Sequence, residues 1–247
     1  FAYWLVKHDT NYQQPNLELI DEWAEAWSYG LIKASNELAQ EKGACPKNME
    51  TKYGHGITPN QTYKKDVDEL VKNKERQDWK GLRASLKEHG IRNSTLMALM
   101  PAETSAQISN STNGIEPPRS YISVKQSKHG VLKQVVPGYP YYKNKYDLLW
   151  DQKSPQGYLK IMAVLQKYID QGISVNTSYN PEHFDEEKVP MSTLLGDIMT
   201  FYKYGGKQLY YNNTHDGQGE IDINKDESLE QLSLGEIDDD DCESCKI

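Results

Sequence analysis

The stretch that decides the fold is residues 92–118, RNSTLMALMPAETSAQISNSTNGIEPP. Its first part, from Ser94 to Met100, is short, apolar and bounded, which is typical of a buried strand that ends at Pro101. A helix with small hydroxyl residues in its first turn is expected next, opened by Ala102, Glu103, Thr104 and Ser105. A strand that runs into a helix N-terminus creates an anion site, because free N–H groups and the positive end of the helix dipole face outward. An ordinary strand-to-helix turn capped by Ser and Thr is the alternative, and the residues alone leave both open.

Apolar periodicity around this stretch predicts helices on both sides of it. Residues 17–42 repeat apolar positions at three- and four-residue steps and stop at Gly43, and residues 79–89 stop at Gly90. Residues 158–170 predict a further helix, with one buried side. The last helix is expected to begin at Pro190, with a buried face made of Met191, Leu194, Leu195, Ile198 and Tyr202.

The predicted strands are separated by these helices. Residues 121–125 and 131–136 flank a His-Gly pair and predict a hairpin. Residues 174–179 and 207–214 predict two further strands. Helices interleaved with well-separated strands indicate an α/β body.

The charge of the 247-residue chain, formally −8, is unevenly distributed. Residues 216–247 hold 12 acidic and two basic side chains and no aromatic ones, whereas residues 1–215 hold 24 acidic and 26 basic ones. We therefore expect a folded body over residues 1–215 and a flexible acidic tail over residues 216–247. The body lacks the basic excess of a nucleic-acid-binding domain, and no apolar run is long enough to span a membrane. A soluble, cytoplasmic protein is expected, in the host cytoplasm if it is viral.

The chain has three cysteines, and two of them, Cys242 and Cys245, form a Cys-x-x-Cys pair in the tail. Such a pair can be half of a zinc site or a redox dithiol. No second Cys/His pair is at hand, and a dithiol near the end of a flexible segment suits thiol–disulfide exchange. Cys45 stands alone in a loop and is interpreted as structural. His55 has no second ligand at metal spacing, so no metal site is predicted.

Tyr210 and Tyr211 are neighbours in the last predicted strand. Successive residues of a strand point to opposite faces, so two neighbours share a face only where the strand ends or bends. The ordinary interpretation is one tyrosine inside and one outside.

Two parts of the opening stretch, residues 100–105 (MPAETS) and residues 113–119 (NGIEPPR), resemble the phosphate-binding segment of the large (alpha) subunit of class I ribonucleotide reductase. The resemblance covers nearly the whole chain, from Phe1 to the CESCKI end. It implies a ten-stranded α/β barrel made of two five-stranded halves, of which this chain would supply the C-terminal part. Residues 94–100, 174–179 and 207–213 would then be barrel strands.

The resemblance also implies roles for the paired tyrosines. The family motif Leu-Tyr-Tyr-x-Asn-Thr is matched by residues 209–214, and its tyrosines relay a radical from the small subunit to an active-site cysteine. By position, Tyr211 would receive the radical and Tyr210 would pass it on. A phenol suits this role because an electron and a proton can leave together, so no net charge builds up inside the protein.

Further roles follow from the same resemblance. The turn formed by Ala102, Glu103, Thr104 and Ser105 would hold the diphosphate of a nucleoside diphosphate substrate. Cys242 and Cys245 would re-reduce the active-site disulfide and would be reduced in turn by thioredoxin or glutaredoxin. No cofactor is expected in this chain, because the radical comes from a metal-containing small (beta) subunit.

Reductases of this family need a radical-bearing cysteine and two reducing cysteines in the barrel. Only Cys45 lies outside the tail here, so the catalytic thiols are expected on another chain, an N-terminal part of the large subunit. The chain is therefore expected to be a fragment or one half of a split subunit, inactive without its partners. The alternative is a non-enzymatic phosphate-binding or redox-tail module.

Overall fold

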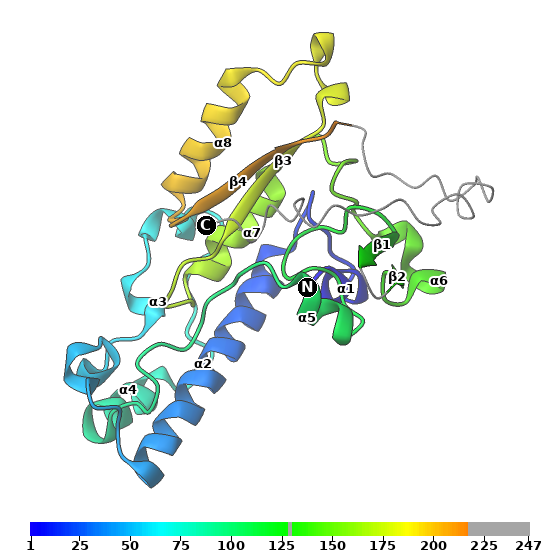
Figure 1. Cartoon of the computed structure of the whole chain (residues 1–247). Coiled ribbons are helices and arrows are strands. Elements are labelled where there is room, and N and C mark those ends of the chain that lie inside the picture. Colours follow the sequence, from blue (N-terminus) through cyan, green and yellow to red (C-terminus); the bar gives the residue numbers. More distant parts are fainter. Residues whose placement is uncertain (128–129, 217–247) are drawn as a thin grey trace.

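The computed structural model describes residues 1–127 and 130–216. Its helices are α1 (Ala2–Lys7), α2 (Leu17–Lys42), α3 (Pro59–Thr62), α4 (Trp79–His89), α5 (Glu103–Ile108), α6 (Tyr139–Tyr142), α7 (Gln156–Gln166) and α8 (Met191–Lys203). Its strands are β1 (Ile122–Ser127), β2 (Gly130–Val135), β3 (Val175–Tyr179) and β4 (Leu209–Thr214). In Figure 1 the long helix α2 runs alongside α7, and α8 lies beside the β3–β4 pair. Over the described residues, no helix is both long enough and apolar enough to cross a membrane.

Helices α2 and α4 begin and end where the sequence predicts. Asn16 caps α2 by accepting a hydrogen bond from the Leu19 amide at 3.2 Å, and Asp78 caps α4 by accepting one from the Gly81 amide at 2.9 Å. Helix α2 ends at Gly43, whose φ of +82° favours a residue without a Cβ atom. Both predicted helices are confirmed.

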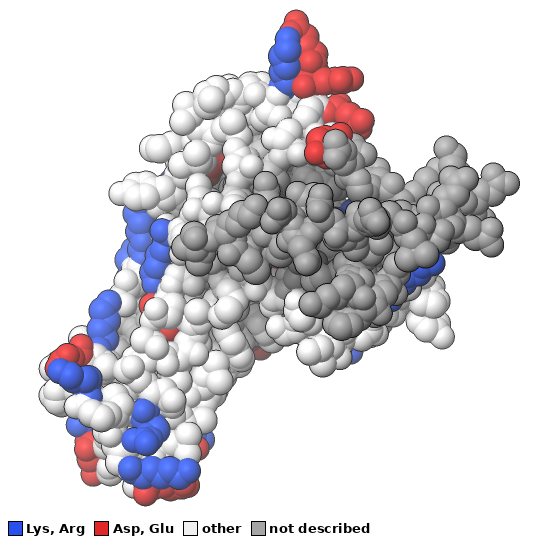
Figure 2. Space-filling view, in the orientation of Figure 1, with Lys and Arg blue, Asp and Glu red and all other residues white. Residues whose placement is uncertain are grey.

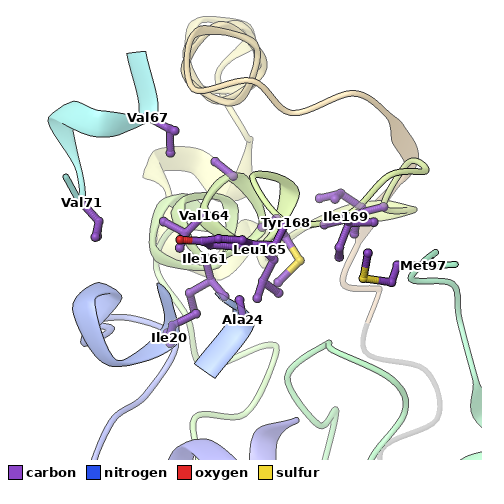
Figure 3. Packing of buried hydrophobic residues seen from close by; sticks show 14 of the residues in the cluster. Ile20, Ala24, Val67, Val71, Met97, Ile161, Val164, Leu165, Tyr168 and Ile169 are labelled. Carbon is purple, nitrogen blue, oxygen red and sulfur yellow. The ribbon is translucent and has the colours of Figure 1, made fainter. Parts of the chain in front are cut away.

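Helix α7 forms the centre of the hydrophobic core. Every residue from 157 to 166 except Lys160 is buried. Helices α2 and α8 both contact α7, and in Figure 3 the side chains of Ile20 and Ala24 on α2 reach toward Ile161. The prediction of a helix over residues 158–170 with one buried side is therefore wrong in two respects. The helix ends earlier, at Gln166, and it is buried nearly all round because neighbouring elements cover more than one of its faces.

A buried network of charged side chains joins α2 to the end of α7. The Asp21 carboxylate accepts hydrogen bonds from Lys167 Nζ at 2.7 Å, from the Tyr168 hydroxyl at 2.9 Å and from Arg76 Nη1 at 2.9 Å. Arg76 also pairs with Glu25 at 2.8 Å. The side chains of Asp21 and Lys167 are both 0% exposed, so each neutralises a charge that would be costly to bury alone.

The described strands form two separate two-stranded sheets, and no sheet closes on itself over these residues. Strands β1 and β2 pair in antiparallel fashion, which confirms the predicted hairpin. Strands β3 and β4, which also lie where strands were predicted, pair in parallel.

The predicted strand over residues 94–100 is not a regular strand. Leu99 makes one isolated parallel bridge with Ile173, and no longer ladder forms. The reason lies at Asp170, whose carboxylate accepts hydrogen bonds from the amides of Leu96 and Met97 at 2.9 and 3.0 Å. A side chain therefore takes the amides that a strand partner would otherwise satisfy.

The buried face predicted for α8 is wrong. Met191, Leu195, Ile198 and Tyr202 are exposed and Leu194 is half-buried, whereas the buried residues of this helix are Asp197 and Phe201. The Asp197 carboxylate is held inside by hydrogen bonds from the Tyr179 hydroxyl, at 2.8 Å, and from the side-chain Nε2 of Gln156. The helix therefore turns a polar residue inward and leaves much of its apolar face in solvent.

Candidate functional site

Tyr210 and Tyr211 lie at a β-bulge. In the β3–β4 ladder Val175 pairs with Leu209 and Thr177 pairs with Asn212, so two residues of β4 lie opposite one residue of β3. A bulge of this kind interrupts the strict alternation of side chains and redirects them. The two rings consequently meet, with centroids 4.3 Å apart and an interplanar angle of 61°. The one-in, one-out arrangement of a regular strand is wrong here, and both tyrosines are about half exposed.

The residue opposite the bulge is Asn176, and its side chain fixes the bulge in place. Asn176 Oδ1 accepts a hydrogen bond from the Tyr211 amide at 3.0 Å. Its Nδ2 donates to the Glu116 carboxylate. Burial raises the pKa of Glu116, whereas the bond from Asn176 and the charge of Arg119 lower it. The amide of Asn176 therefore ties the tyrosine pair to the loop that holds Glu116.

Buried phenols lie behind this loop. The Tyr12 hydroxyl donates to the Ile115 carbonyl at 2.8 Å. The Tyr158 hydroxyl is buried. Burial, followed by the nearby charge of Glu116, raises the pKa of Tyr158. These surroundings keep the buried phenols neutral.

The predicted anion turn lies at the start of α5, with Ala102 as the residue before the helix. The first-turn amides of a helix have no acceptor within the helix, and the side chains of Thr104 and Ser105 are exposed beside them. The Ala102 amide donates to Asn113 Oδ1 at 2.9 Å. That amide is therefore already bonded in this structure, and a phosphate would have to displace the Asn113 side chain in order to accept the hydrogen bond from Ala102.

One loop connects the two parts of the candidate site. Asn113 accepts a hydrogen bond from the Ala102 amide in the anion turn, and Glu116, three residues later, accepts one from the Asn176 side chain that bonds to the tyrosine pair. Between them Gly114 adopts a φ of +48°, and a Cβ atom there would lie 3.3 Å from the Met100 carbonyl oxygen, so glycine lets the loop approach the turn closely.

Sequence reasoning gave no role to the three residues that hold the site together: Asn113, Glu116 and Asn176. The first two stand inside the NGIEPPR segment, so the signal was present but was used only for the resemblance. Asn176 lies on the half-buried face of β3, and a single polar residue there gives no sign of a bulge on the next strand.

Cys45 is the cysteine that falls within the described residues. Cys242 and Cys245 lie outside the described residues. Cys45 is free and partly buried, and its amide donates to the Ile91 carbonyl at 2.8 Å. Within residues 1–127 and 130–216, no cluster of His, Cys, Asp and Glu side chains could hold a metal ion.

Comparison with known proteins identifies the family. The family described as "Ribonucleotide reductase, barrel domain" matches residues 1–142 and 138–212. The chain is 52% identical to ribonucleoside-diphosphate reductase 1 subunit alpha of Salmonella typhimurium and 51% identical to the protein of that name in Escherichia coli. It is 42% identical to ribonucleoside-diphosphate reductase subunit alpha of Enterobacteria phage T4. Each match covers 100% of this chain and 32% of the relative.

The chain therefore spans about a third of the length of these relatives. The family is one of α/β barrels, in agreement with the interleaved helices and the parallel β3–β4 pair. The match extends over most of the described body and includes the anion turn, the connecting loop and the tyrosine pair. On this evidence the chain belongs to the ribonucleotide reductase barrel-domain family.

Proposed function

We propose that this chain is the C-terminal part of the large (alpha) subunit of a class I ribonucleoside-diphosphate reductase. It would take part in converting ribonucleotides to deoxyribonucleotides for DNA synthesis, by a radical mechanism, in the cytoplasm. The chain would supply the substrate phosphate site, the radical-relay tyrosines and the tail dithiol. An N-terminal part of the large subunit would supply the active-site cysteines, and a metal-containing small subunit would supply the radical.

The observation that carries this proposal is the contact between Tyr210 and Tyr211. A relay needs two oxidisable side chains in contact, and the bulge brings these rings to a centroid distance of 4.3 Å. A relay also needs access for the chain that delivers the radical, and Tyr211 is 54% exposed. A phenol that loses an electron together with its proton stays uncharged, which avoids the cost of a charge at a partly buried position.

The substrate diphosphate would lie at the start of α5. Its charge would be met by the first-turn amides and by the hydroxyls of Thr104 and Ser105, with the Ala102 amide released from Asn113. Leu99 pairs in parallel with Ile173 just before β3, and β3 pairs in parallel with β4. We interpret these three segments as adjacent strands of a ten-stranded barrel. The remaining strands would come from the rest of the large subunit.

The reduction consumes two electrons for each substrate. The 2′-hydroxyl leaves as water while two active-site thiols form a disulfide, and that disulfide must be reduced before the next turnover. Cys242 and Cys245 would reduce it by thiol–disulfide exchange and would then be reduced by thioredoxin or glutaredoxin. Cys242→Ser or Cys245→Ser should stop turnover with those proteins and preserve it with dithiothreitol, and loss with both reductants would contradict the shuttle.

The relay is tested by Tyr210→Phe and Tyr211→Phe in the complex reconstituted with both partner chains. Phenylalanine keeps the ring and its packing and removes only the hydroxyl. Each variant should assemble and bind nucleotide normally and should form no deoxynucleotide. Tyr141→Phe is a matched control, because Tyr141 is an exposed tyrosine outside the bulge. Near-normal turnover in both bulge variants would refute the relay.

The non-enzymatic alternative, a phosphate-binding or redox-tail module, makes a different prediction. In such a module Tyr→Phe at either bulge position would cost about 0.5–1.5 kcal/mol of stability at most and would leave its binding unchanged. The retained tyrosine contact favours the reductase, because neither phosphate binding nor tail redox chemistry requires two contacting phenols.

A further inference from the structure

A cavity of about 640 Å³ lies where three distant parts of the chain meet. The turns between α2 and α4 contribute Tyr53 and Tyr63, the segment that follows α7 contributes Ile169, and the end of α8 with the turn after it contributes Tyr202 and Tyr204. Small-molecule sites typically occupy about 300–1,000 Å³. Aromatic rings on two of the three walls suit a ligand with a flat or apolar body. Neither the tyrosine pair nor the anion turn lines this cavity.

Two lysines at the cavity, Lys52 and Lys207, have no carboxylate within 4 Å among the described residues; we call them the cavity lysines. Lys207 Nζ donates to the carbonyls of Ile169, at 3.5 Å, and Gln171, at 3.3 Å. Burial lowers the pKa of Lys207, the charge of Lys52 lowers it further, and the charge of Asp170 opposes both. The cavity lysines therefore repel each other, and the charge of Asp170 offsets this repulsion only in part.

The carboxylates that line the same cavity are already engaged. Asp170 accepts a hydrogen bond from the Tyr53 hydroxyl at 2.8 Å, in addition to two backbone amides. Glu50 pairs with Lys47 at 2.5 Å. Neither carboxylate forms an ion pair with a cavity lysine.

The other lysines that line the cavity do have partners. Lys167 is neutralised by Asp21 at 2.7 Å. Lys64 lies 3.9 Å from Asp66, and its Nζ donates to the Tyr202 carbonyl at 3.1 Å. Among the described residues that line the cavity, Lys52 and Lys207 are therefore the lysines that form no ion pair. In Figure 2 basic side chains gather on the flank where α3 and the adjacent end of α8 lie in Figure 1.

We propose that this cavity binds a small molecule that carries a doubly charged phosphate group on an aromatic or apolar body, with the phosphate between Lys52 and Lys207. A phosphate dianion matches the charge of two ammonium groups, and lysine binds phosphate as a compact point charge. The tyrosine walls would contact the body of the ligand. This inference concerns binding by the chain itself and does not depend on the proposed reductase function.

Phenyl phosphate is the probe, titrated into the full 247-residue chain by isothermal calorimetry. Binding should be saturable and one-to-one. Lys52→Gln and Lys207→Gln should each weaken it about fivefold or more, because each removes one charged partner of the phosphate. Lys33→Gln, which changes an exposed lysine on α2 that pairs with Glu37, should leave binding unchanged. Phenol, which lacks the phosphate, should bind at least about tenfold more weakly.

Proton uptake gives a second readout. Because the pKa of Lys207 is lowered in the free chain, a bound dianion should raise it, and binding at alkaline pH should take up protons. This uptake, measured from the dependence of the binding enthalpy on the buffer, should vanish in Lys207→Gln. Thermal unfolding of each variant confirms that it is folded. No saturable binding, or equal binding by the wild-type chain and both glutamine variants, would overturn the proposal.

Discussion

The buried pair of Asp21 and Lys167 should be the most sensitive point of the fold, and Asp21→Asn tests this. Asparagine keeps the size of the side chain and one acceptor oxygen, which can still accept from Tyr168. It removes the negative charge that faces Lys167 Nζ at 2.7 Å and Arg76 Nη1 at 2.9 Å. Arg76 keeps its bond to Glu25, but Lys167 keeps no carboxylate partner and is left with the Val71 carbonyl at 3.5 Å and the faces of two tyrosine rings.

The expected loss follows from the burial of that lysine. Its side chain is 0% exposed, so no water replaces the lost carboxylate. Breaking one partner of a buried ion pair typically costs about 3–5 kcal/mol, because an uncompensated charge stays buried. Against a total stability of about 5–15 kcal/mol, this is a large share. The double variant Asp21→Asn with Lys167→Met removes the stranded charge and should recover at least about 2 kcal/mol relative to the single variant.

Urea unfolding followed by circular dichroism measures these differences, with an unchanged slope as evidence that the same surface unfolds. Asp66→Asn is the matched control: Asp66 pairs with Lys64 at 3.9 Å, and both side chains are more than 40% exposed. That change should cost less than about 1 kcal/mol. A loss below about 1 kcal/mol for Asp21→Asn would refute the reasoning. A double variant no more stable than the single one would refute it as well.

Three further predictions concern the candidate site. Burial raises the pKa of Glu116 above its ordinary value of 4.5, so the folded chain holds the carboxyl proton more tightly than the unfolded chain. The resulting stabilisation is complete below pH 4.5 and is lost as the pH rises through the raised pKa of the folded chain. Glu116→Gln should flatten this part of the pH–stability curve measured by urea unfolding, and an unchanged curve would contradict the assignment. Asn176→Ala should speed hydrogen exchange of the Tyr211 amide and weaken the ring-to-ring nuclear Overhauser effects of the tyrosine pair. Asn176→Gln, which keeps a side-chain amide, should change both measurements less. Intact ring contacts in the alanine variant would show that the bulge does not need Asn176. Thr104→Ala with Ser105→Ala should weaken substrate binding by the reconstituted complex, by about 1.5–3 kcal/mol for each hydroxyl bonded to a charged phosphate, and unchanged affinity would remove these hydroxyls from the phosphate site.

The sequence predicts best those elements whose signals are local. Helices α2 and α4 combine apolar periodicity with a side-chain cap before the first turn and a glycine after the last, so both ends were readable. The hairpin and strands β3 and β4 were equally clear from alternation and turn residues. The helix start after Pro101 was also predicted, from the small hydroxyl residues that follow the proline, and its role as an anion site stays a prediction.

The errors arose where a distant polar side chain decides the local structure. The Asp170 carboxylate accepts hydrogen bonds from the amides of residues 96 and 97, and the local sequence around these residues does not predict this contact. Helix α8 has a clear apolar stripe, but bonds to Asp197 select a different side of the helix for burial. The bulge depends on pairing between two strands, so the sequence of β4 alone suggests regular alternation where the structure brings Tyr210 and Tyr211 together.

The central claim is that this chain provides one part of a reductase whose thiols and radical come from other chains. The most direct measurement is deoxynucleotide formation by the purified chain alone, with an N-terminal part of the large subunit, and with that part and the small subunit together. The account predicts no product from the chain alone, because it has one cysteine outside its tail pair, and none from the second mixture, because it lacks the small subunit that would supply the radical. Turnover is expected only from the third mixture. Turnover by the chain alone, or no turnover by an assembled complex of all three parts, would contradict it.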